Sequence, residues 1–172
     1  MTVGVRVLGA DEVRTHAAAL AAVLIDCVEG GASVGFMATL SPEEARAYFD
    51  TVYDGIAAGR RTLLAAFDGE ELVGTVQLLV AMLPNATHRG EIAKLLVHRA
   101  ARRRGIAQAL MSRAELEARE MGKTLLVLDT ATGSEAERLY EKLGWDRLGS
   151  VPGWALYPDG SPCETTFFVK SL

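Results

Sequence analysis

A hydrophobic segment, a short basic turn and an amphipathic helix follow one another near the middle of the chain, and they constrain its fold most. The segment Ile92–Val97 predicts a β-strand, and the run Arg102-Arg103-Arg104-Gly105-Ile106-Ala107 opens a helix that extends to about Met121. The next apolar run, Leu125–Leu128, is typical of a strand buried on both faces. Residues 92–128 are therefore predicted to form a βαβ unit with parallel strands, which indicates an α/β fold with a mixed sheet.

Other patterns add strands and helices on both sides of this unit. Further strands are predicted at Val3–Leu8, Thr62–Phe67, Leu72–Met82, Trp145–Leu148 and Thr165–Val169. Further helices are predicted from Asp11, which is expected to cap the first of them, to Gly30, from the Ser41–Glu44 capping box to Gly59, and from the Ser134–Glu137 capping box to Leu143. The segments Gly30–Leu40 and around Trp154 are predicted to be loops. We expect residues 1–172 to form a single domain, because no linker or repeat divides them.

Composition argues against several classes of protein. The 18 Lys and Arg residues are outnumbered by 22 Asp and Glu, whereas nucleic-acid binders usually carry a large basic surface. No apolar run reaches the length of a membrane span, and no signal peptide precedes the first strand. The two cysteines, Cys27 and Cys163, lie far apart, which favours a reducing compartment. We expect a cytoplasmic protein that binds neither nucleic acid nor membrane.

The basic turn has the composition of a site for an anion. The first N–H groups of a helix have no partner within the helix, and the positive end of the helix dipole lies there. Gly105 lets the backbone close around a phosphate, and three arginines supply positive charge. The alternative is a solvated helix start, but cations at a helix N-terminus oppose the dipole. The turn therefore predicts a small phosphorylated ligand.

This turn and a second motif resemble those of the GNAT acetyltransferases. The family's signature is Arg or Gln, two residues, Gly, one residue and then Gly or Ala, which Arg102, Gly105 and Ala107 match. The stretch 139–145, LYEKLGW, resembles the family's LYxxxGF ending. The resemblance implies a mixed, mostly antiparallel sheet with a central parallel βαβ unit and helices on both faces.

The same resemblance implies acetyl-CoA as co-substrate and indicates where it binds. The pantetheine arm is expected along the backbone of the strand, at Leu95, Leu96 and Val97. The pyrophosphate is expected on the backbone N–H groups of the turn, at Arg102, Arg103, Arg104, Gly105, Ile106 and Ala107.

Two further segments resemble the tabtoxin-resistance acetyltransferases within that family. They are GGASVGFM at 30–37 and the segment from Pro152 to Gly160. Those enzymes acetylate an amine of a small amino-acid-like toxin, so this resemblance implies a small-molecule amine as acceptor. The side chains then expected to bind the acceptor are Ser33, Phe36, Met37 and Trp154. The alternative for each is a small apolar cluster beneath two long loops.

Acetyl transfer to an amine requires a base for the ammonium, a donor to the oxyanion and an acid for the leaving thiolate. Glu91 and Asp129 are the candidate bases. The alternative for Glu91 is a solvated residue at the start of a strand, and the alternative for Asp129 is a carboxylate that accepts from a helix terminus or from loop amides. Tyr140 is the candidate acid by its place in the family motif, although it also belongs to an apolar helical stripe. Lys94 interrupts an apolar strand. Strict alternation places it on the opposite face from Glu91, so an ion pair between the two would require a bulge, and we expect its side chain to extend to the edge of the sheet instead.

These residues predict an acetyl-CoA-dependent N-acetyltransferase that acts on a small amine by direct attack in a ternary complex. Two alternatives stay open: an acetyltransferase of protein N-termini or lysines, and a non-catalytic sensor that binds acyl-CoA. No histidine or cysteine spacing suggests a metal site. The long hairpin and the final strands leave a sheet edge that can pair between subunits, so a homodimer is also considered.

Overall fold

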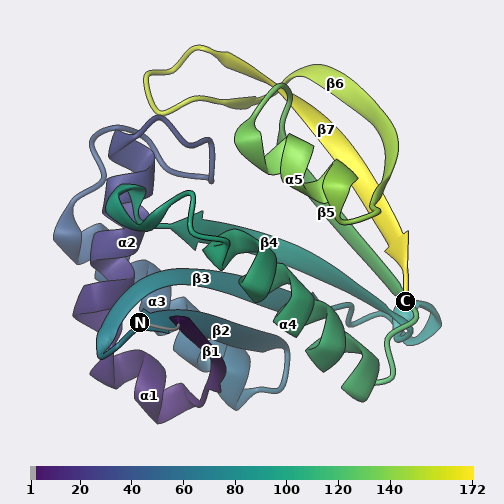
Figure 1. Ribbon diagram of the computed structural model, residues 1–172, viewed down its shortest axis with the longest axis horizontal. Coiled ribbons are helices and arrows are strands. Elements are labelled where there is room, and N and C mark those ends of the chain that lie inside the picture. Colours follow the sequence, from purple (N-terminus) through teal and green to yellow (C-terminus); the bar gives the residue numbers. More distant parts are fainter. Residues whose placement is uncertain (1–2) are drawn as a thin grey trace.

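The computed structural model describes residues 3–172, which are built on a seven-stranded sheet (Figure 1). Its strands are β1 (Val3–Leu8), β2 (Arg61–Asp68), β3 (Glu71–Val80), β4 (Arg89–Val97), β5 (Leu125–Ala131), β6 (Asp146–Leu156) and β7 (Pro162–Ser171). Their order across the sheet is β1-β2-β3-β4-β5-β7-β6. β4 and β5 pair in parallel, and the other neighbouring pairs are antiparallel. The predicted mixed sheet with its parallel βαβ unit is confirmed.

Helices cover both faces of the sheet (Figure 1). They are α1 (Ala10–Thr15), α2 (Ala17–Glu29), α3 (Pro42–Ala57), α4 (Ile106–Glu120) and α5 (Glu135–Lys142), with 3-10 turns η1 (Pro84–Ala86) and η2 (Arg99–Ala101). The first three pack in one core cluster with Leu63 and Ala65 of β2. α4 and α5 pack in the other cluster with Leu64 and Ala66, as the alternation of a strand buried on both faces requires. None of the helices in the described part of the chain is long and apolar enough to cross a membrane.

The parallel strands β4 and β5 separate soon after they begin to pair. Their ladder joins residues 89–91 to residues 125–127, and within residues 3–172 it extends no further. β5 instead stays paired with β7 as far as Ala131. The edge of β4 that faces β5 therefore has backbone groups in residues 92–97 without a strand partner. Such groups require water or a ligand to satisfy them.

A β-bulge distorts β4 at the same level. β4 has two residues, Lys94 and Leu95, where its partner β3 has only Val76. The Lys94 backbone is left-handed, with φ of 52°, which costs a residue other than glycine on the order of 1 kcal/mol. The bulge bends β4 in the region where it departs from β5.

The first predicted helix differs from the structure. It was expected to run from Asp11 to Gly30, but it is divided at His16 into α1 and α2. The His16 backbone leaves the helical region (φ −96°, ψ 9°), and its ring packs edge-on against Phe67 of β2. The expected Asp11 cap is also wrong: α1 begins after Gly9, whose N–H donates to the Glu12 carboxylate. A tertiary contact thus ends the first helix early.

The loop expected around Trp154 is instead the second half of β6. Pairing with β7 has a first irregularity between Arg147 and Gly149. It is interrupted again after Val151 and resumes at Ala155, so residues 152–154 face the single residue Glu164. The proline at position 152 has no N–H for a ladder, and an irregular stretch accommodates it within a strand. Trp154 therefore lies on the strand at the edge of the sheet rather than on a loop.

The predicted helix caps are confirmed at the hydroxyl groups. Ser41 Oγ accepts from the Glu44 N–H, and the Glu44 carboxylate accepts from the Ser41 N–H. Ser134 Oγ accepts from the Glu137 N–H, although the Glu137 carboxylate accepts from the N–H of Gly133 instead of Ser134. These bonds fix the start of α5 just beyond the end of β5.

A buried ion pair anchors α4, the helix that follows the basic turn. Lys170 Nζ of β7 lies 2.9 and 2.8 Å from the two carboxylate oxygens of Glu115 on α4. It also donates to the Leu143 carbonyl at 2.7 Å, while Trp145 Nε1 donates to Glu115 at 3.1 Å. The cluster joins α4 to β7 and to the end of α5.

Removal of the Glu115 carboxylate is expected to destabilise the fold. Glu115→Ala leaves the Lys170 ammonium buried without its counter-charge, so the free energy of unfolding should fall by about 3 kcal/mol in urea denaturation. Glu117→Ala on the same helix is the control, because its partner Arg113 is 39% exposed and such pairs contribute less than about 1 kcal/mol. Equal losses in the two variants would contradict the role of the buried pair.

Candidate active site

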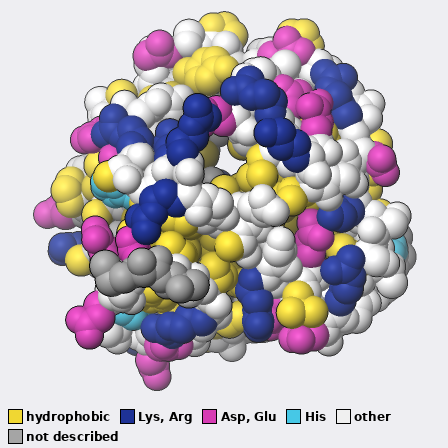
Figure 2. All heavy atoms as spheres, in the orientation of Figure 1, with side chains coloured by type: hydrophobic (Ala, Val, Ile, Leu, Met, Phe, Trp, Pro, Cys, Tyr) yellow, Lys and Arg dark blue, Asp and Glu magenta, His cyan; other side chains and the backbone are white. Residues whose placement is uncertain are grey.

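A cavity of about 720 Å³ opens where β4 and β5 separate. Its walls come from these two strands, the turn before α4, the start of α5 and the loop that follows α2. Figure 2 shows a hollow on this face of the molecule that is bordered by Lys and Arg side chains. Segments that are far apart in the sequence thus meet around one space.

The turn between η2 and α4 forms one end of the cavity. The lining residues from this turn are Arg102, Arg103, Gly105, Ile106 and Ala107. The backbones of Arg103 and Gly105 are left-handed, with φ of 64° and 77°, and Gly105 is the N-cap of α4. A backbone of this kind curves successive N–H groups around a concave space, and the first turn of α4 adds N–H groups without helical partners. The turn therefore has the form of a phosphate site.

The three arginine side chains of the turn have different partners. Arg102 Nε donates to the last carbonyl of β4 at 3.0 Å, so it holds the turn against that strand. Arg103 pairs with Glu135 at the start of α5, with an N–O distance of 2.8 Å. Arg104 pairs with Asp68 at the end of β2, also at 2.8 Å, and does not line the cavity. The sequence treats the three as equivalent, but the structure brings only the first two to the cavity.

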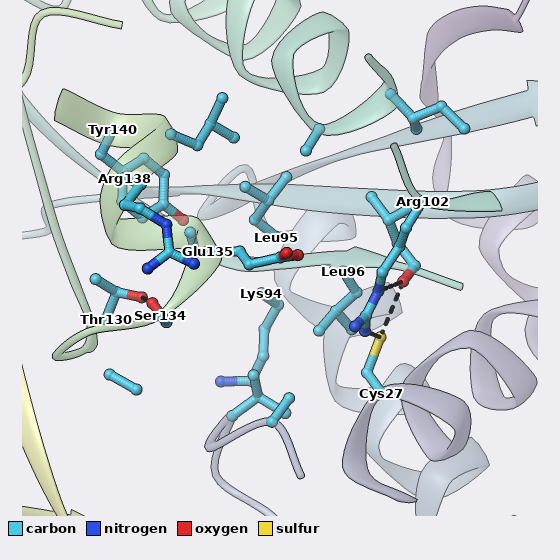
Figure 3. A pocket seen from close by; sticks show the side chains of 18 of the residues that line it. Cys27, Lys94, Leu95, Leu96, Arg102, Thr130, Ser134, Glu135, Arg138 and Tyr140 are labelled. Atoms are coloured by element: carbon cyan, nitrogen blue, oxygen red, sulfur yellow. Dashed lines mark hydrogen bonds between the residues drawn. The ribbon is translucent and has the colours of Figure 1, made fainter. Parts of the chain in front are cut away.

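The free edge of β4 lies between this turn and the middle of the cavity. Leu95, Leu96 and Val97 all line the cavity, together with Cys27 of α2. Cys27 Sγ lies 3.5 Å from the Val97 carbonyl and 3.8 Å from Arg102 Nη2 (Figure 3). Burial is the main cause that raises the pKa of the Cys27 thiol, so the group stays protonated and packs against the turn. No local pattern in the sequence indicates that this cysteine lies at the site.

Two of the three predicted catalytic residues line the cavity: Asp129 on β5 and Tyr140 on α5. Tyr140 is only 5% exposed, and no residue from 3 to 172 accepts or donates a hydrogen bond at its hydroxyl. Burial, followed by the negative charge of Asp129, raises the pKa of Tyr140. The ring also packs against Trp145 and Phe168, so Tyr140 belongs to the apolar stripe of the helix and lines the cavity as well. The phenol therefore stays protonated and has a proton to donate.

Glu91 lies next to this region but does not line the cavity. It is the last residue of β4 that pairs with β5. Its partner is Val127, which precedes Asp129 by two residues on β5. Partial desolvation, followed by the charge of Asp129, raises the pKa of the exposed Glu91 carboxyl. The two candidate bases thus lie on neighbouring parallel strands, and the charge of Asp129 acts on Glu91.

Lys94 is the site residue whose position the sequence misjudged. The expectation that its side chain extends to the edge of the sheet is wrong. β4 is the central strand, and at the bulge the Lys94 side chain lines the cavity. Figure 3 shows the side chain extending from β4 into this space. Burial lowers the pKa of Lys94, while the charge of Asp129 opposes this effect. The signal in the sequence is a single charge within an apolar strand.

The four residues expected to bind the acceptor are divided by the structure. Ser33 lines the cavity, and its Oγ donates to the Leu156 carbonyl at 2.8 Å. Phe36 instead packs edge-on against Tyr48, and Met37 is 43% exposed. Trp154 lies on a strand and not on a loop. Its side chain is 60% exposed and packs edge-on against the ring of Phe167 on β7. The structure therefore brings one of the four to the cavity.

Several polar residues at the cavity were not predicted from the sequence, and Thr130, Ser134 and Arg138 are among them. Thr130 and Ser134 carry hydroxyl groups 3.4 Å apart, and Arg138 of α5 lies above them (Figure 3). Arg138 Nη1 donates to the Gly133 carbonyl at 3.2 Å. A polar cluster just after a buried strand is the signal that indicates such a site.

Comparison with solved structures identifies the fold. Ribosomal-protein-alanine N-acetyltransferase from Brucella melitensis is similar with a TM-score of 0.81 and 20% identity, over 98% of this chain and 99% of the other. YncA, a putative acetyltransferase from Salmonella typhimurium with its cofactor acetyl-CoA, has a TM-score of 0.80 and 19% identity, over 100% and 95%. A putative phosphinothricin N-acetyltransferase has a TM-score of 0.80 and 18% identity, over 99% of both chains.

Comparison with models of protein families identifies the family of the chain as well as its fold. Residues 22–145 match the acetyltransferase (GNAT) family, and this range contains the cavity, the basic turn and the LYEKLGW motif. The chain therefore belongs to the GNAT acetyltransferase family. It is an N-acetyltransferase of that family, with acetyl-CoA as the acetyl donor.

The left-handed glycine of the turn provides a test of the acetyl-CoA site. A side chain at Gly105 meets no atom within 4 Å, so Gly105→Ala is strained only by its φ of 77°, at a cost of about 1–2 kcal/mol. We expect the acetyl-CoA dissociation constant to rise about tenfold, equivalent to ~1.4 kcal/mol, because the backbone N–H groups around the phosphates shift. Isothermal titration calorimetry measures this change.

Gly122 is the matched control at the other end of α4. Its φ is 74° and its surroundings are equally open, so Gly122→Ala should lower the melting temperature by a similar few degrees. Its affinity for acetyl-CoA should equal that of the wild type. Similar weakening of binding in both variants would mean that the loss comes from general destabilisation and not from the turn.

Proposed function

We propose that this chain transfers the acetyl group of acetyl-CoA to the amine of a small molecule, by direct attack in a ternary complex. The observation that carries the proposal is the placement of Asp129 and Tyr140 at one cavity, beside the free backbone edge of β4. One group accepts a proton and the other donates one, as the reaction requires. A non-catalytic sensor would need neither.

The reaction follows from the chemistry of these groups. The acceptor ammonium gives a proton to Asp129, directly or through water, and the free amine attacks the thioester carbonyl. A backbone N–H of the strand Leu95–Val97 donates to the developing oxyanion. When the carbon–sulfur bond breaks, Tyr140 protonates the leaving thiolate. The acetylated nitrogen gives its second proton to solvent and Tyr140 regains one from solvent. Asp129 then releases the first proton, so the reaction produces one proton overall. The raised pKa of Tyr140 keeps the phenol protonated before this step.

The segment above the acceptor end supports a small acceptor over a protein chain. Ser33 Oγ donates to the Leu156 carbonyl at 2.8 Å, and the Ala38 N–H donates to the Pro158 carbonyl at 2.9 Å. The loop after α2 is thereby joined to the β6–β7 hairpin, beside which it lies in Figure 1. An acceptor that is a protein N-terminus or lysine would need an open groove between these segments.

The narrower relationship to the tabtoxin-resistance acetyltransferases is part of this proposal. It is supported by the GGASVGFM stretch at 30–37, which forms the loop just described and includes Ser33 at the cavity. The similar fold of a putative phosphinothricin N-acetyltransferase agrees with it. The similar fold of a ribosomal-protein-alanine N-acetyltransferase keeps protein N-termini as the second candidate.

Replacement of the Tyr140 hydroxyl tests the reaction. Tyr140→Phe keeps the packing of the ring and removes the proton donor, so kcat should fall about a hundredfold while the acetyl-CoA dissociation constant stays within about twofold. Acetyl-CoA turnover and calorimetric binding measure the two quantities. Unchanged turnover would remove Tyr140 from the mechanism, and a wild-type protein that fails to bind acetyl-CoA would overturn the proposed function.

The choice between the two bases is tested by pH dependence. We expect Asp129→Asn to lower kcat/KM about a hundredfold at every pH, and Glu91→Gln to lower it less than tenfold, because Asp129 lines the cavity. Asp129 raises the pKa of Glu91, so its removal lowers that pKa. If Asp129→Asn keeps full activity and its acidic limb moves to lower pH, Glu91 is the base instead.

A further inference from the structure

The acceptor end of the cavity contains a cation that the reaction does not use. Lys94 lines the cavity, and within residues 3–172 its ammonium forms no ion pair and no hydrogen bond. By contrast, the other positive side chains that line it from the basic turn are engaged: Arg102 with a carbonyl and Arg103 with a carboxylate. A half-buried ammonium without a partner is unfavourable, so a ligand that supplies a negative charge is expected to bind there.

The backbone of Lys94 is distorted at the place where its side chain enters the cavity. A lysine in the left-handed region is uncommon, and bulges next to binding sites turn a side chain away from the face that strict alternation gives it. Conformations of this kind persist where the surrounding structure and function require them. The bulge therefore has a functional consequence: it brings a charge into the cavity that a regular strand would place elsewhere.

Lys94 lies at the reacting end of the cavity and not at the phosphate end. Lys94 precedes residues 95–97 of the same strand, whereas the basic turn begins only at Arg102. Its Nζ is 3.7 Å from the point that a side-chain carbon on Gly35 would occupy, so it reaches the loop that covers the acceptor. The absent side chain at Gly35 leaves room beside the ammonium. Figure 3 shows Lys94 apart from Arg102 and Cys27.

Charges of both signs surround this end. The carboxylate of Asp129 acts on Lys94 strongly enough to oppose the effect of its burial, and Glu91 acts in the same direction. Arg61 adds a second positive charge nearby, although its own Nη1 donates to Gln77 at 3.0 Å. A ligand that presents an ammonium to the acidic side and an anion to Lys94 complements this arrangement. A simple alkyl amine would leave Lys94 without a counter-charge.

We propose that Lys94 is a specificity-determining residue that binds a carboxylate of the acceptor, so that the acceptor is an amine that also carries a carboxylate. This inference rests on the proposed function and adds to it the group that Lys94 recognises. A compact ammonium on a flexible stem suits a single carboxylate oxygen. The same contact turns the acceptor amine toward Asp129, since the two charges of the ligand then meet opposite charges of the site.

The test compares free amino acids with their carboxamides, which differ only in the charge of the carboxylate. A pool of α-amino acids and dipeptides and a pool of the same compounds as amides are offered with acetyl-CoA, and release of the CoA thiol is measured. We expect kcat/KM for the acid pool to exceed that for the amide pool at least tenfold in the wild type. In Lys94→Met this ratio should fall at least tenfold, mainly through KM, and Lys94→Arg should retain most of it.

Lys94→Asn provides a second neutral variant, because asparagine tolerates the left-handed backbone better than methionine. Both neutral variants should keep the wild-type affinity for acetyl-CoA. The inference is overturned if the ratio is unchanged in the neutral variants, or if the wild type binds acetyl-CoA but acetylates the amide pool as well as the acid pool or neither pool. Failure to bind acetyl-CoA would instead overturn the proposed function itself.

Discussion

The site depends on the separation of β4 from β5 after Glu91. Paired strands lie about 4.8 Å apart, which leaves no space for a ligand between them. Here β5 continues beside β7, while β4 continues beside β3 and bends at its bulge. The separation creates the cavity, frees one backbone edge of β4, and lets the N-termini of α4 and α5 open onto the same space.

The charges around this cavity are organised by where each strand ends. Asp129 stands near the end of β5, and its carboxylate influences Glu91, Lys94 and Tyr140 together. Because these groups are partly removed from water, solvent screens the charge of Asp129 from them less than it would in bulk water. The side chains of Asp129, Lys94 and Tyr140 therefore lie around one cavity. The basic turn lies at the other end of the cavity.

The parts of the site that depend on the local order of the chain are predictable from the sequence. The turn from Arg102 to Ala107 joins a strand to a helix, so its position at the cavity follows from its neighbours in the chain. Asp129 and Tyr140 came from one strand and one family motif and lie at the same cavity. Lys94 was misjudged, because the sequence pattern gives no sign of a bulge that depends on pairing with β3. Trp154 was assigned to a loop, because the long β7 that holds its segment as a strand is remote in sequence.

By itself, the sequence determined the βαβ unit, the basic glycine turn and the helix caps at Ser41 and Ser134, since each depends on hydrogen bonds and periodicity within a few residues. Tertiary structure alone decided that Arg104 pairs with Asp68 while Arg103 reaches Glu135, and that Ser33 lies at the cavity while Phe36 packs against Tyr48. It also decided that Lys94 enters the cavity. The physical reason is that strand register and side-chain partners are set by contacts between distant segments, which no local pattern of residues contains.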